Sequence, residues 1–220
     1  MEFNKNNTFC ISLESMPGRW VRMEARFQHF GMECERWPAS TPIDVVDRFA
    51  GYLNGGQRAC GQSHVNIWRT ILDRGLDYAL ILEDDAVFHY DWIARLRTLN
   101  LAEDPVWDAV FLNASEPIEP EKTWVVCSEQ YLTGAYIISR RGVEWLLSNF
   151  ACEFASSDWM TSRLQTRGHS YSYFPWLVIQ EGFESTIGSG FEADHLKVVR
   201  CLGERMAEYR EPKVPLYEPS

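Results

Sequence analysis

The segment YALILEDD, residues 78–85, constrains the fold most, because an apolar run of strand length leads directly into three acids. Such a run is typical of a strand that is covered on both faces at the centre of an α/β sheet. The acids Glu83, Asp84 and Asp85 disfavour one another's ionisation unless a cation neutralises them. The segment therefore predicts a central strand with an unusual concentration of negative charge at its carboxyl end.

The remaining apolar pattern predicts an α/β fold with one mixed, mainly parallel central sheet flanked by helices. Apolar residues at helical spacing predict helices over 17–30, 63–72, 141–148 and 157–165. Short apolar runs predict strands over 8–13, 33–37, 78–82, 108–112, 123–127, 132–138 and 171–179, the last interrupted by Pro175. Residues 38–56 are predicted to be irregular, with Asn54-Gly55-Gly56 as a loop. Ligands of open α/β sheets bind outside the carboxyl ends of the strands, so the three acids are expected at a binding crevice.

Length and composition narrow the class of protein. The 220 residues suit one domain covering 1–220, with 1–7 and 211–220 as extended tails. A formal net charge of -10 makes nucleic acid an unfavourable partner. The six cysteines are scattered without CxxC spacing, which argues against a zinc site. No apolar run approaches the roughly 20 residues of a membrane span. We expect a cytoplasmic protein, with attachment to a membrane surface, or a host cytoplasm for a viral chain, as alternatives.

Two interpretations of the acids at 83–85 stay open. In the structural one, one acid caps the next element and the others are solvated. In the functional one, they bind a hard divalent cation such as Mg²⁺, which takes one or two carboxylates and completes its shell with phosphates and water. Neither a P-loop nor a GxGxxG fingerprint occurs, so any bound phosphate is expected to be held in another way.

Four stretches of the chain resemble a known family. They are CISLESMPGRW, ACGQSHVNIWRTILDRGLDYALILEDDAVF, LTGAYIISRRGVEWLL and SSDWM. Together they resemble glycosyltransferase family 25, the lipooligosaccharide and collagen galactosyltransferase-like group, and more loosely the metal-dependent transferases of the GT-A fold. The second stretch is the specific one, although it has Ala-Cys-Gly where the family has Gly-Cys. The resemblance implies a metal-dependent, inverting transferase that moves a sugar from a UDP-sugar to a glycan or glycoconjugate.

The same resemblance implies a site for Mn²⁺ or Mg²⁺. Asp85 is the first expected metal ligand. His195 is the second, with a surface histidine or ligation by Asp194 as alternatives. Glu83 or Asp84 is expected to reach the ribose or a metal-bound water, and Asp84 has the alternative role of capping the following turn.

The expected nucleotide contacts come from two places. Ser12 and Leu13 follow the first strand, where backbone groups would meet the uracil, and Arg19 would pair with phosphate. The alternative for Arg19 is a solvated helix face. Ser63 and His64 are expected at the start of a helix, where anions are favoured. A structural hydrogen bond is the alternative for His64.

Asp158 in SSDWM is the expected catalytic base, because an inverting transferase needs a carboxylate to take the proton of the acceptor hydroxyl. Its alternative role is that of an acid in the first turn of a helix. Glu181 and Glu184 are weaker candidates.

Two rival functions remain at this point. A nucleotidyltransferase or phosphotransferase could use the same acids, although it would need a Gly-rich basic loop near the first strand, and ESMPGRW is a poor one. A non-catalytic carbohydrate-binding module on the same fold is the other rival. The patterns do not name the sugar, the acceptor or the oligomeric state.

Overall fold

A computed structural model of the chain describes residues 1–113, 123–181 and 191–209, without the side chains of 123 and 191–195. Its centre is a seven-stranded sheet in the order β2-β1-β3-β7-β5-β8-β6, accompanied by a two-stranded sheet, β4-β9. The strands of the large sheet are β1 (Thr8–Ser12), β2 (Glu35–Pro38), β3 (Tyr78–Glu83), β5 (Ala109–Phe111), β6 (Thr123–Val126), β7 (Ala135–Ser139) and β8 (Ser170–Phe174). The small sheet consists of β4 (Ala86–Phe88) and β9 (Val178–Gln180).

The large sheet is mixed, as the sequence predicts. Parallel pairing joins β1 to β2, β1 to β3, and β5 to β8. Antiparallel pairing joins β7 to β3 and to β5, and β6 to β8. Half of the pairs of neighbouring strands are therefore parallel, and the two parallel pairs that include β1 lie in the first part of the chain. Because β7 runs against both its neighbours, the carboxyl ends of β1, β3, β5 and β8 share one edge with the amino end of β7.

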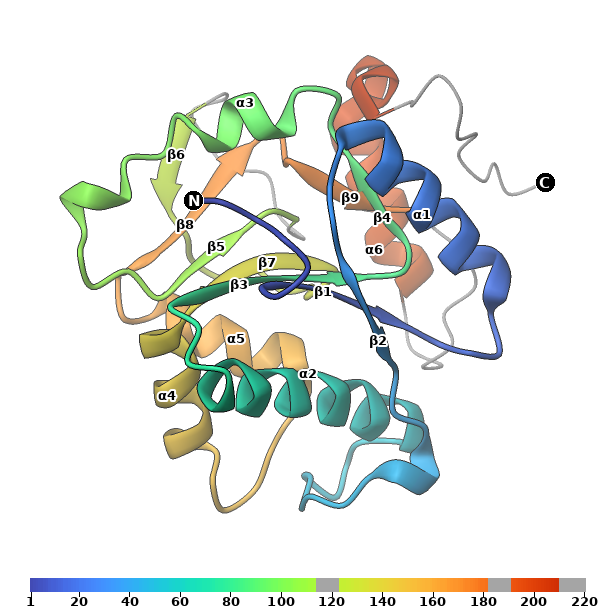
Figure 1. Cartoon of the computed structure of the whole chain (residues 1–220), viewed down its shortest axis with the longest axis vertical. Coiled ribbons are helices and arrows are strands. Elements are labelled where there is room, and N and C mark those ends of the chain that lie inside the picture. Colours follow the sequence, from blue (N-terminus) through green and yellow to red (C-terminus); the bar gives the residue numbers. More distant parts are fainter. Residues whose placement is uncertain (114–122, 182–190, 210–220) are drawn as a thin grey trace.

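Helices cover both faces of this sheet (Figure 1). One face carries α2 (Gly55–Asp73), α4 (Arg140–Asn149) and α5 (Ser157–Gln165), and the other carries α1 (Pro17–Phe30), α3 (Trp92–Leu96) and α6 (Phe191–Leu202). Short 3₁₀ helices add η1 (Pro42–Asp44), η2 (Leu101–Glu103) and η3 (Gly203–Tyr209). The α/β architecture predicted from the sequence is thus confirmed.

The central strand β3 supplies apolar side chains to both cores. Ile81 packs with Trp68 on the α2 side, whereas Leu80 and Leu82 pack with Met23 on the α1 side. Leu80, Ile81 and Leu82 are all fully buried. This two-sided burial explains the continuous apolar run, because a strand with one solvated face would alternate apolar and polar residues.

Helix α2 begins eight residues before its predicted start. Asn54 caps it: the Asn54 side chain accepts a hydrogen bond from the Gln57 amide at 2.8 Å, and the Gln57 side chain accepts one from the Asn54 amide at 3.0 Å. This capping box satisfies two backbone donors and outweighs the low helix propensity of the two glycines. The prediction that Ser63 and His64 start a helix is therefore wrong, and so is the predicted loop at 54–56.

The predicted late strand 171–179 is two strands that belong to different sheets. Proline lacks the amide hydrogen that a sheet interior needs, and the chain leaves the large sheet at Pro175. Strand β9 then pairs with β4, which directly follows the three acids. The patterns did not predict β4, α3 or α6.

The N-terminal residues are held against the sheet, in contrast to the expected tail. The Tyr78 hydroxyl accepts a hydrogen bond from the Glu2 amide at 2.8 Å and donates one to the Glu2 carbonyl at 2.9 Å. The expected tail at 211–220 lies outside the described residues, and the assignment of 1–220 to one domain stays a prediction. Within the described ranges, no helix has the length and hydropathy needed to span a membrane.

Candidate active site

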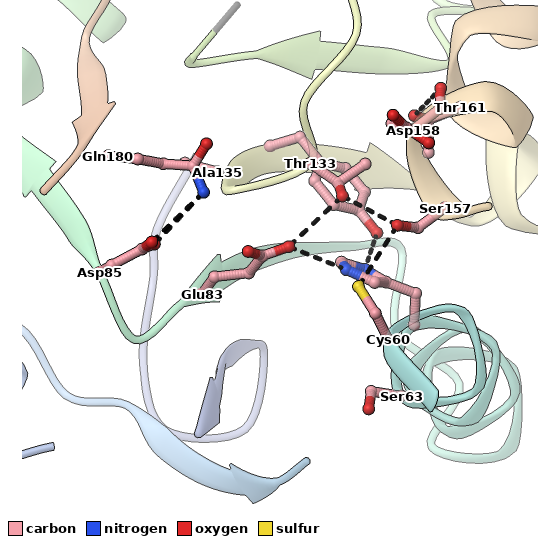
Figure 2. Close-up of polar contacts among 12 residues, drawn as sticks. Cys60, Ser63, Glu83, Asp85, Thr133, Ala135, Ser157, Asp158, Thr161 and Gln180 are labelled. Atoms are coloured by element: carbon pink, nitrogen blue, oxygen red, sulfur yellow. Dashed lines mark hydrogen bonds and ion pairs between the residues drawn. The ribbon is translucent and has the colours of Figure 1, made fainter. Parts of the chain in front are cut away.

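The shared edge of the sheet gathers most of the residues singled out from the sequence, and Figure 2 shows Glu83, Asp85 and Asp158 among them. Ser12 and Leu13 end β1, and Glu83, Asp84 and Asp85 end β3. Thr133 and Gly134 precede β7, and Ser157 and Asp158 open α5, which covers one face near this edge. The strand-end rule therefore predicted correctly that the three acids lie at this edge of the sheet, and their role in a site stays a prediction.

Asp84, the middle acid, is buried and satisfied by the protein. One carboxylate oxygen accepts the Leu13 amide hydrogen at 3.3 Å, and the other lies 3.1 Å from the Arg19 guanidinium. Burial raises the pKa of Asp84, and the charge of Arg19 and a hydrogen bond from Ser12 oppose that rise. Asp84 thus fastens the end of β1 and the start of α1 to β3. Phosphate binding by Arg19 stays a prediction, because this guanidinium already has a carboxylate partner.

Asp85 is buried but poorly satisfied. The Gln180 amide nitrogen lies 3.4 Å from each of its carboxylate oxygens, which is long for a hydrogen bond. Burial raises the pKa of Asp85 to about 7, and the neighbouring charge of Glu83 adds to the rise. The Gln180 side-chain oxygen is buried without a hydrogen-bond partner in the described structure. The amide nitrogen of Gln180, and not this oxygen, faces Asp85 (Figure 2), so the amide would have to turn over to offer its oxygen to a cation held by Asp85. In that orientation a carboxylate and an amide oxygen suit a hard divalent cation such as the one that the sequence suggests.

Glu83 is the most accessible of the three acids, with a quarter of its side chain exposed. Its Oε1 atom lies 3.4 Å from His64 Nε2 and 3.4 Å from the Thr133 hydroxyl. His64 is fully buried in the middle of α2, and its Nδ1 atom lies 2.9 Å from the Tyr136 hydroxyl. His64 therefore contacts the acid at the strand end and a buried tyrosine at the same time.

Asp158 occupies the first turn of α5 and is partly buried. Its carboxylate accepts the Trp159 amide hydrogen at 2.7 Å, and a helix N-terminus favours the charged form of an acid. Its neighbour Ser157 lies with its hydroxyl 3.0 Å from that of Thr133, the residue that also contacts Glu83. Figure 2 shows Asp158 beyond Ser157, as seen from Glu83.

The Cys60 thiol lies 3.7 Å from the Ser157 hydroxyl, near these acids. The charges of Glu83, Asp158 and Asp85 all act on its thiol, although burial is the main reason why its pKa is raised. Three acids from two separate segments are therefore close enough to influence one side chain. This grouping at the end of a central strand is the geometry that a phosphate-bearing, hydroxyl-rich substrate with a divalent ion would need.

Comparison with known proteins identifies the family. The model of glycosyltransferase family 25 (LPS biosynthesis protein) matches residues 5–119, which is more than half of the chain and includes the three acids. The chain belongs to glycosyltransferase family 25. The family resemblance seen in the four sequence stretches is thus confirmed.

Relatives in family 25 differ in length and in described activity. Procollagen galactosyltransferase 1-B of Xenopus laevis is 34% identical over 108 residues, 44% of this chain and 18% of that protein. The lacto-N-neotetraose biosynthesis glycosyltransferase LgtE of Neisseria meningitidis is 28% identical over 229 residues, 84% of this chain and 80% of that protein. Inactive glycosyltransferase 25 family member 3 of Homo sapiens is 32% identical over 172 residues, 66% of this chain and 29% of that protein. This chain therefore matches less than a third of the length of these two animal relatives.

Among solved structures, a glycosyltransferase involved in glycosylation of the major capsid of PBCV-1 is similar at 13% identity and a TM-score of 0.35. The match covers 66% of this chain and 68% of that chain. A TM-score of this size supports no inference about the site, and the fold rests on the strand pairing described above.

Two site residues predicted from the sequence of this family 25 chain, Ser63 and His195, have no described contact with the acids. The Ser63 hydroxyl accepts the Ser40 amide hydrogen at 2.9 Å and donates to the Ala59 carbonyl at 3.0 Å. The hydroxyl therefore already makes one hydrogen bond as acceptor and one as donor within the protein. A nucleotide contact by Ser63 stays a prediction. His195 lies in α6, and its side chain is outside the described part of the structure, so metal ligation by His195 also stays a prediction.

The sequence patterns missed three neighbouring residues, of which Gln180 contacts Asp85 and Asn113 and Gly134 lie next to Gln180. A Cβ atom added to Gly134 would lie 2.9 Å from Gln180 Cγ and Cδ and 3.0 Å from Asn113 Nδ2, so a larger residue there would displace the Gln180 side chain. Asn113 follows the apolar run at 109–112, just as the three acids follow β3, and that repeated pattern could have identified it. Gln180 could not be found in this way, because its place depends on the pairing of β4 with β9.

Proposed function

We propose that this chain is a metal-dependent, inverting glycosyltransferase that moves a sugar from a UDP-sugar to a hydroxyl of a glycan or glycoconjugate. Family membership supports the reaction class. The single observation that supports metal dependence best is Asp85, a buried carboxylate with a raised pKa whose two oxygens each lie 3.4 Å from the Gln180 amide nitrogen. Such a group is unfavourable without a cation and favourable with one.

The donor would bind over the carboxyl ends of β1 and β3. Asp85 would hold Mn²⁺ or Mg²⁺ together with Gln180, and His195 is the further ligand suggested by the sequence. When bound, the ion supplies positive charge that stabilises the UDP leaving group. The backbone after Ser12 would contact the base, and the free oxygen of Glu83 would accept a hydroxyl hydrogen of the donor.

The acceptor would approach from the α5 side. Its hydroxyl oxygen attacks the anomeric carbon, the bond from that carbon to the UDP oxygen breaks, and Asp158 takes the hydroxyl proton. Asp158 suits this role because it is a carboxylate in the first turn of α5 and lies on the other side of Thr133 and Ser157 from Glu83. Attack opposite the leaving group inverts the configuration of the sugar.

The names of the relatives favour galactose as the sugar. The Xenopus laevis relative is a procollagen galactosyltransferase, and the Neisseria meningitidis relative acts in lacto-N-neotetraose biosynthesis. We therefore propose UDP-galactose as the first donor to test. Because the two relatives have different acceptors, a panel of glycans and glycoconjugates is needed on the acceptor side.

A non-catalytic role is the second candidate, and one observation favours it. A relative from Homo sapiens with 32% identity is described as inactive, so family membership alone does not establish turnover. A protein of this kind would bind a sugar or nucleotide sugar without releasing UDP.

Release of UDP separates these candidates. The purified chain is incubated with UDP-galactose, UDP-glucose and UDP-N-acetylglucosamine, with Mn²⁺ or with EDTA, and UDP is measured with and without acceptor glycans. We expect release with one donor in Mn²⁺ and its loss in Asp85→Asn. Binding of a UDP-sugar without release under any of these conditions would overturn the enzymatic proposal in favour of the binding role.

A further inference from the structure

Two buried hydrogen bonds of 2.9 Å connect Trp68, Tyr136 and His64 in the core, and a longer, partly buried contact continues this network to Glu83. The Trp68 indole nitrogen lies 2.9 Å from the Tyr136 hydroxyl, which lies 2.9 Å from His64 Nδ1. On the opposite side of the imidazole ring, Nε2 lies 3.4 Å from Glu83 Oε1. Trp68, Tyr136 and His64 are fully buried, so water does not compete for the two contacts of Tyr136, whereas Glu83 is a quarter exposed.

When His64 is neutral, the hydrogen bonds that connect Trp68, Tyr136, His64 and Glu83 can run in only one consistent direction from donor to acceptor. An indole nitrogen only donates, so the Tyr136 oxygen accepts from Trp68. The single hydrogen of Tyr136 then points to His64 Nδ1, its other neighbour in the chain. Nδ1 is therefore an acceptor, and the ring hydrogen sits on Nε2, facing Glu83. The protein core thus fixes the tautomer of His64, as assigned from the network.

This arrangement leaves one oxygen of Glu83 available. Oε1 is contacted by His64 and by Thr133, whereas Oε2 has no hydrogen-bond partner among the described residues. Asp84 differs, because each of its oxygens already has a protein partner. Of the two acids expected to meet the donor, Glu83 therefore has the free oxygen, and His64 determines where that oxygen points.

We propose that His64 is a positioning residue that holds Glu83 through its Nε2 hydrogen, so that Glu83 Oε2 accepts a hydroxyl hydrogen of a UDP-sugar donor. The ligand part of this inference rests on the proposed function. The role of His64 differs from the nucleotide contact expected from the sequence, since a fully buried side chain acts on the donor through Glu83. Trp68 and Tyr136 set the tautomer and do not meet the donor.

A metal site is the competing explanation for this cluster. Ligand atoms of Cys60, His64 and Glu83 all lie within 4.8 Å of one another, and such a set would suit Zn²⁺. A metal on Nε2 would force the ring hydrogen onto Nδ1, toward the Tyr136 oxygen that already accepts from Trp68. The tyrosine hydrogen would then lose its acceptor in a fully buried place, which is unfavourable. The buried chain therefore favours the positioning role.

Two substitutions of His64 separate positioning from simple packing. In His64→Gln the amide nitrogen can take the place of Nε2 and donate to Glu83, but the acceptor for Tyr136 is lost. In His64→Asn the amide oxygen can take the place of Nδ1 and accept from Tyr136, but the donor to Glu83 is lost. We expect UDP-galactose affinity, measured calorimetrically with Mn²⁺, to fall roughly tenfold in His64→Asn and to stay near the parental value in His64→Gln. The opposite order would overturn the proposal and assign His64 a packing role.

The variant Glu83→Gln is the reference with which the effect of His64→Asn on donor affinity is compared. Because His64 acts through Glu83, the double variant His64→Asn/Glu83→Gln is expected to bind UDP-galactose no more weakly than Glu83→Gln alone. Additive losses in the double variant would contradict an effect that passes through Glu83. UDP alone is measured in parallel, and equal losses for UDP and UDP-galactose would place the accepted hydroxyl on the ribose.

The tautomer can be tested without any donor. Nitrogen NMR of the parent protein is expected to show His64 protonated at Nε2 and not at Nδ1, and Tyr136→Phe is expected to remove that preference. A proton on Nδ1 in the parent would overturn the proposal even if the donor is found to be a different sugar. Failure of UDP-galactose to bind, with the Nε2 proton confirmed, would instead count against the proposed function. Binding of Zn²⁺ that is lost in Cys60→Ser would favour the metal explanation and overturn the positioning role.

Discussion

Arg19 and Asp84 form a buried ion pair of 3.1 Å at the carboxyl end of the central strand. Both side chains are at most one-tenth exposed, and the second oxygen of Asp84 holds the Leu13 amide. The middle acid of the three is thus a structural residue, whereas the acids on either side of it face the candidate active site. This division of roles explains how three adjacent carboxylates can be tolerated.

Removing one partner of this pair is expected to destabilise the fold strongly. Arg19→Met leaves the Asp84 carboxylate buried without its cation, and the free energy of unfolding should fall by about 3–5 kcal/mol. The double variant Arg19→Met/Asp84→Asn should recover most of that loss, because no unpaired charge remains. Urea unfolding measures both values. Arg48→Met, at an ion pair with Glu153 in which the side chains are 79% and 44% exposed, is the control and should change stability by less than about 1 kcal/mol. Equal effects at the two sites would contradict the structural role of Asp84.

Replacing the proposed base should slow transfer without weakening the donor. Asp158→Asn keeps an oxygen that accepts the Trp159 amide but cannot take a proton. General-base catalysis contributes about 10²- to 10⁴-fold, so kcat should fall by that factor while UDP-sugar affinity stays nearly unchanged. Steady-state kinetics and calorimetry measure the two quantities separately.

Transfer by Asp158→Asn at close to the parental rate would show that another group is the base. Asp84 is paired with Arg19, and Glu181 is buried against Arg22 and Arg26. Glu83 would then be the next acid to test. A variant that unfolds would instead favour a stabilising role at the start of α5.

The pH dependence of stability should show the effect of His89. This ring is buried, its Nδ1 atom accepts the Asp91 amide hydrogen at 3.0 Å, and its Nε2 atom lies 2.6 Å from a Glu208 oxygen. Burial lowers the pKa of His89, and protonation would also require breaking the bond from Asp91. Above about pH 6.5 the histidine is neutral in both folded and unfolded chains. Below that pH the unfolded chain takes up the proton first, so the stability of the fold should decrease, by at most about 1.4 kcal/mol per pH unit for this group.

His89→Gln is the matched variant for this prediction, since its amide can still donate to Glu208. The difference in unfolding free energy between parent and variant, measured from pH 7.5 to 5.5, should shrink as the pH falls. The pKa of Glu208 is also lowered in the folded chain, and its stabilisation should be lost only at more acidic pH, beginning near its ordinary value. A difference that stays constant across this range would contradict the prediction.

Local patterns predicted the elements that depend on nearby residues. The apolar run of β3 and the helical spacing of α1, which ends at Gly31 in the left-handed conformation, lie close to their predicted bounds. The strand-end rule then placed the acids correctly at one edge. The start of α2 was wrong because the Asn54 capping box outweighs the glycines that suggested a loop.

Long-range relationships could not be predicted from the sequence. The position of Gln180 beside Asp85 depends on β4 and β9 pairing across more than ninety residues of chain. The direction of the hydrogen bonds at His64 depends on Tyr136 from a strand that is distant in sequence. An expected place at the start of a helix made His64 a candidate contact for the nucleotide. Its burial in the middle of α2 instead supports the proposal that it acts through Glu83.

The central claim is that Asp85 binds a divalent ion that holds the diphosphate of the donor. Calorimetric titration of UDP into the parent protein and into Asp85→Asn, each with Mn²⁺ and with EDTA, tests it most directly. We predict that Mn²⁺ tightens UDP binding at least tenfold in the parent and that Asp85→Asn removes most of this gain while its thermal unfolding remains cooperative. An affinity for UDP that is the same with Mn²⁺ and with EDTA in the parent would contradict the claim.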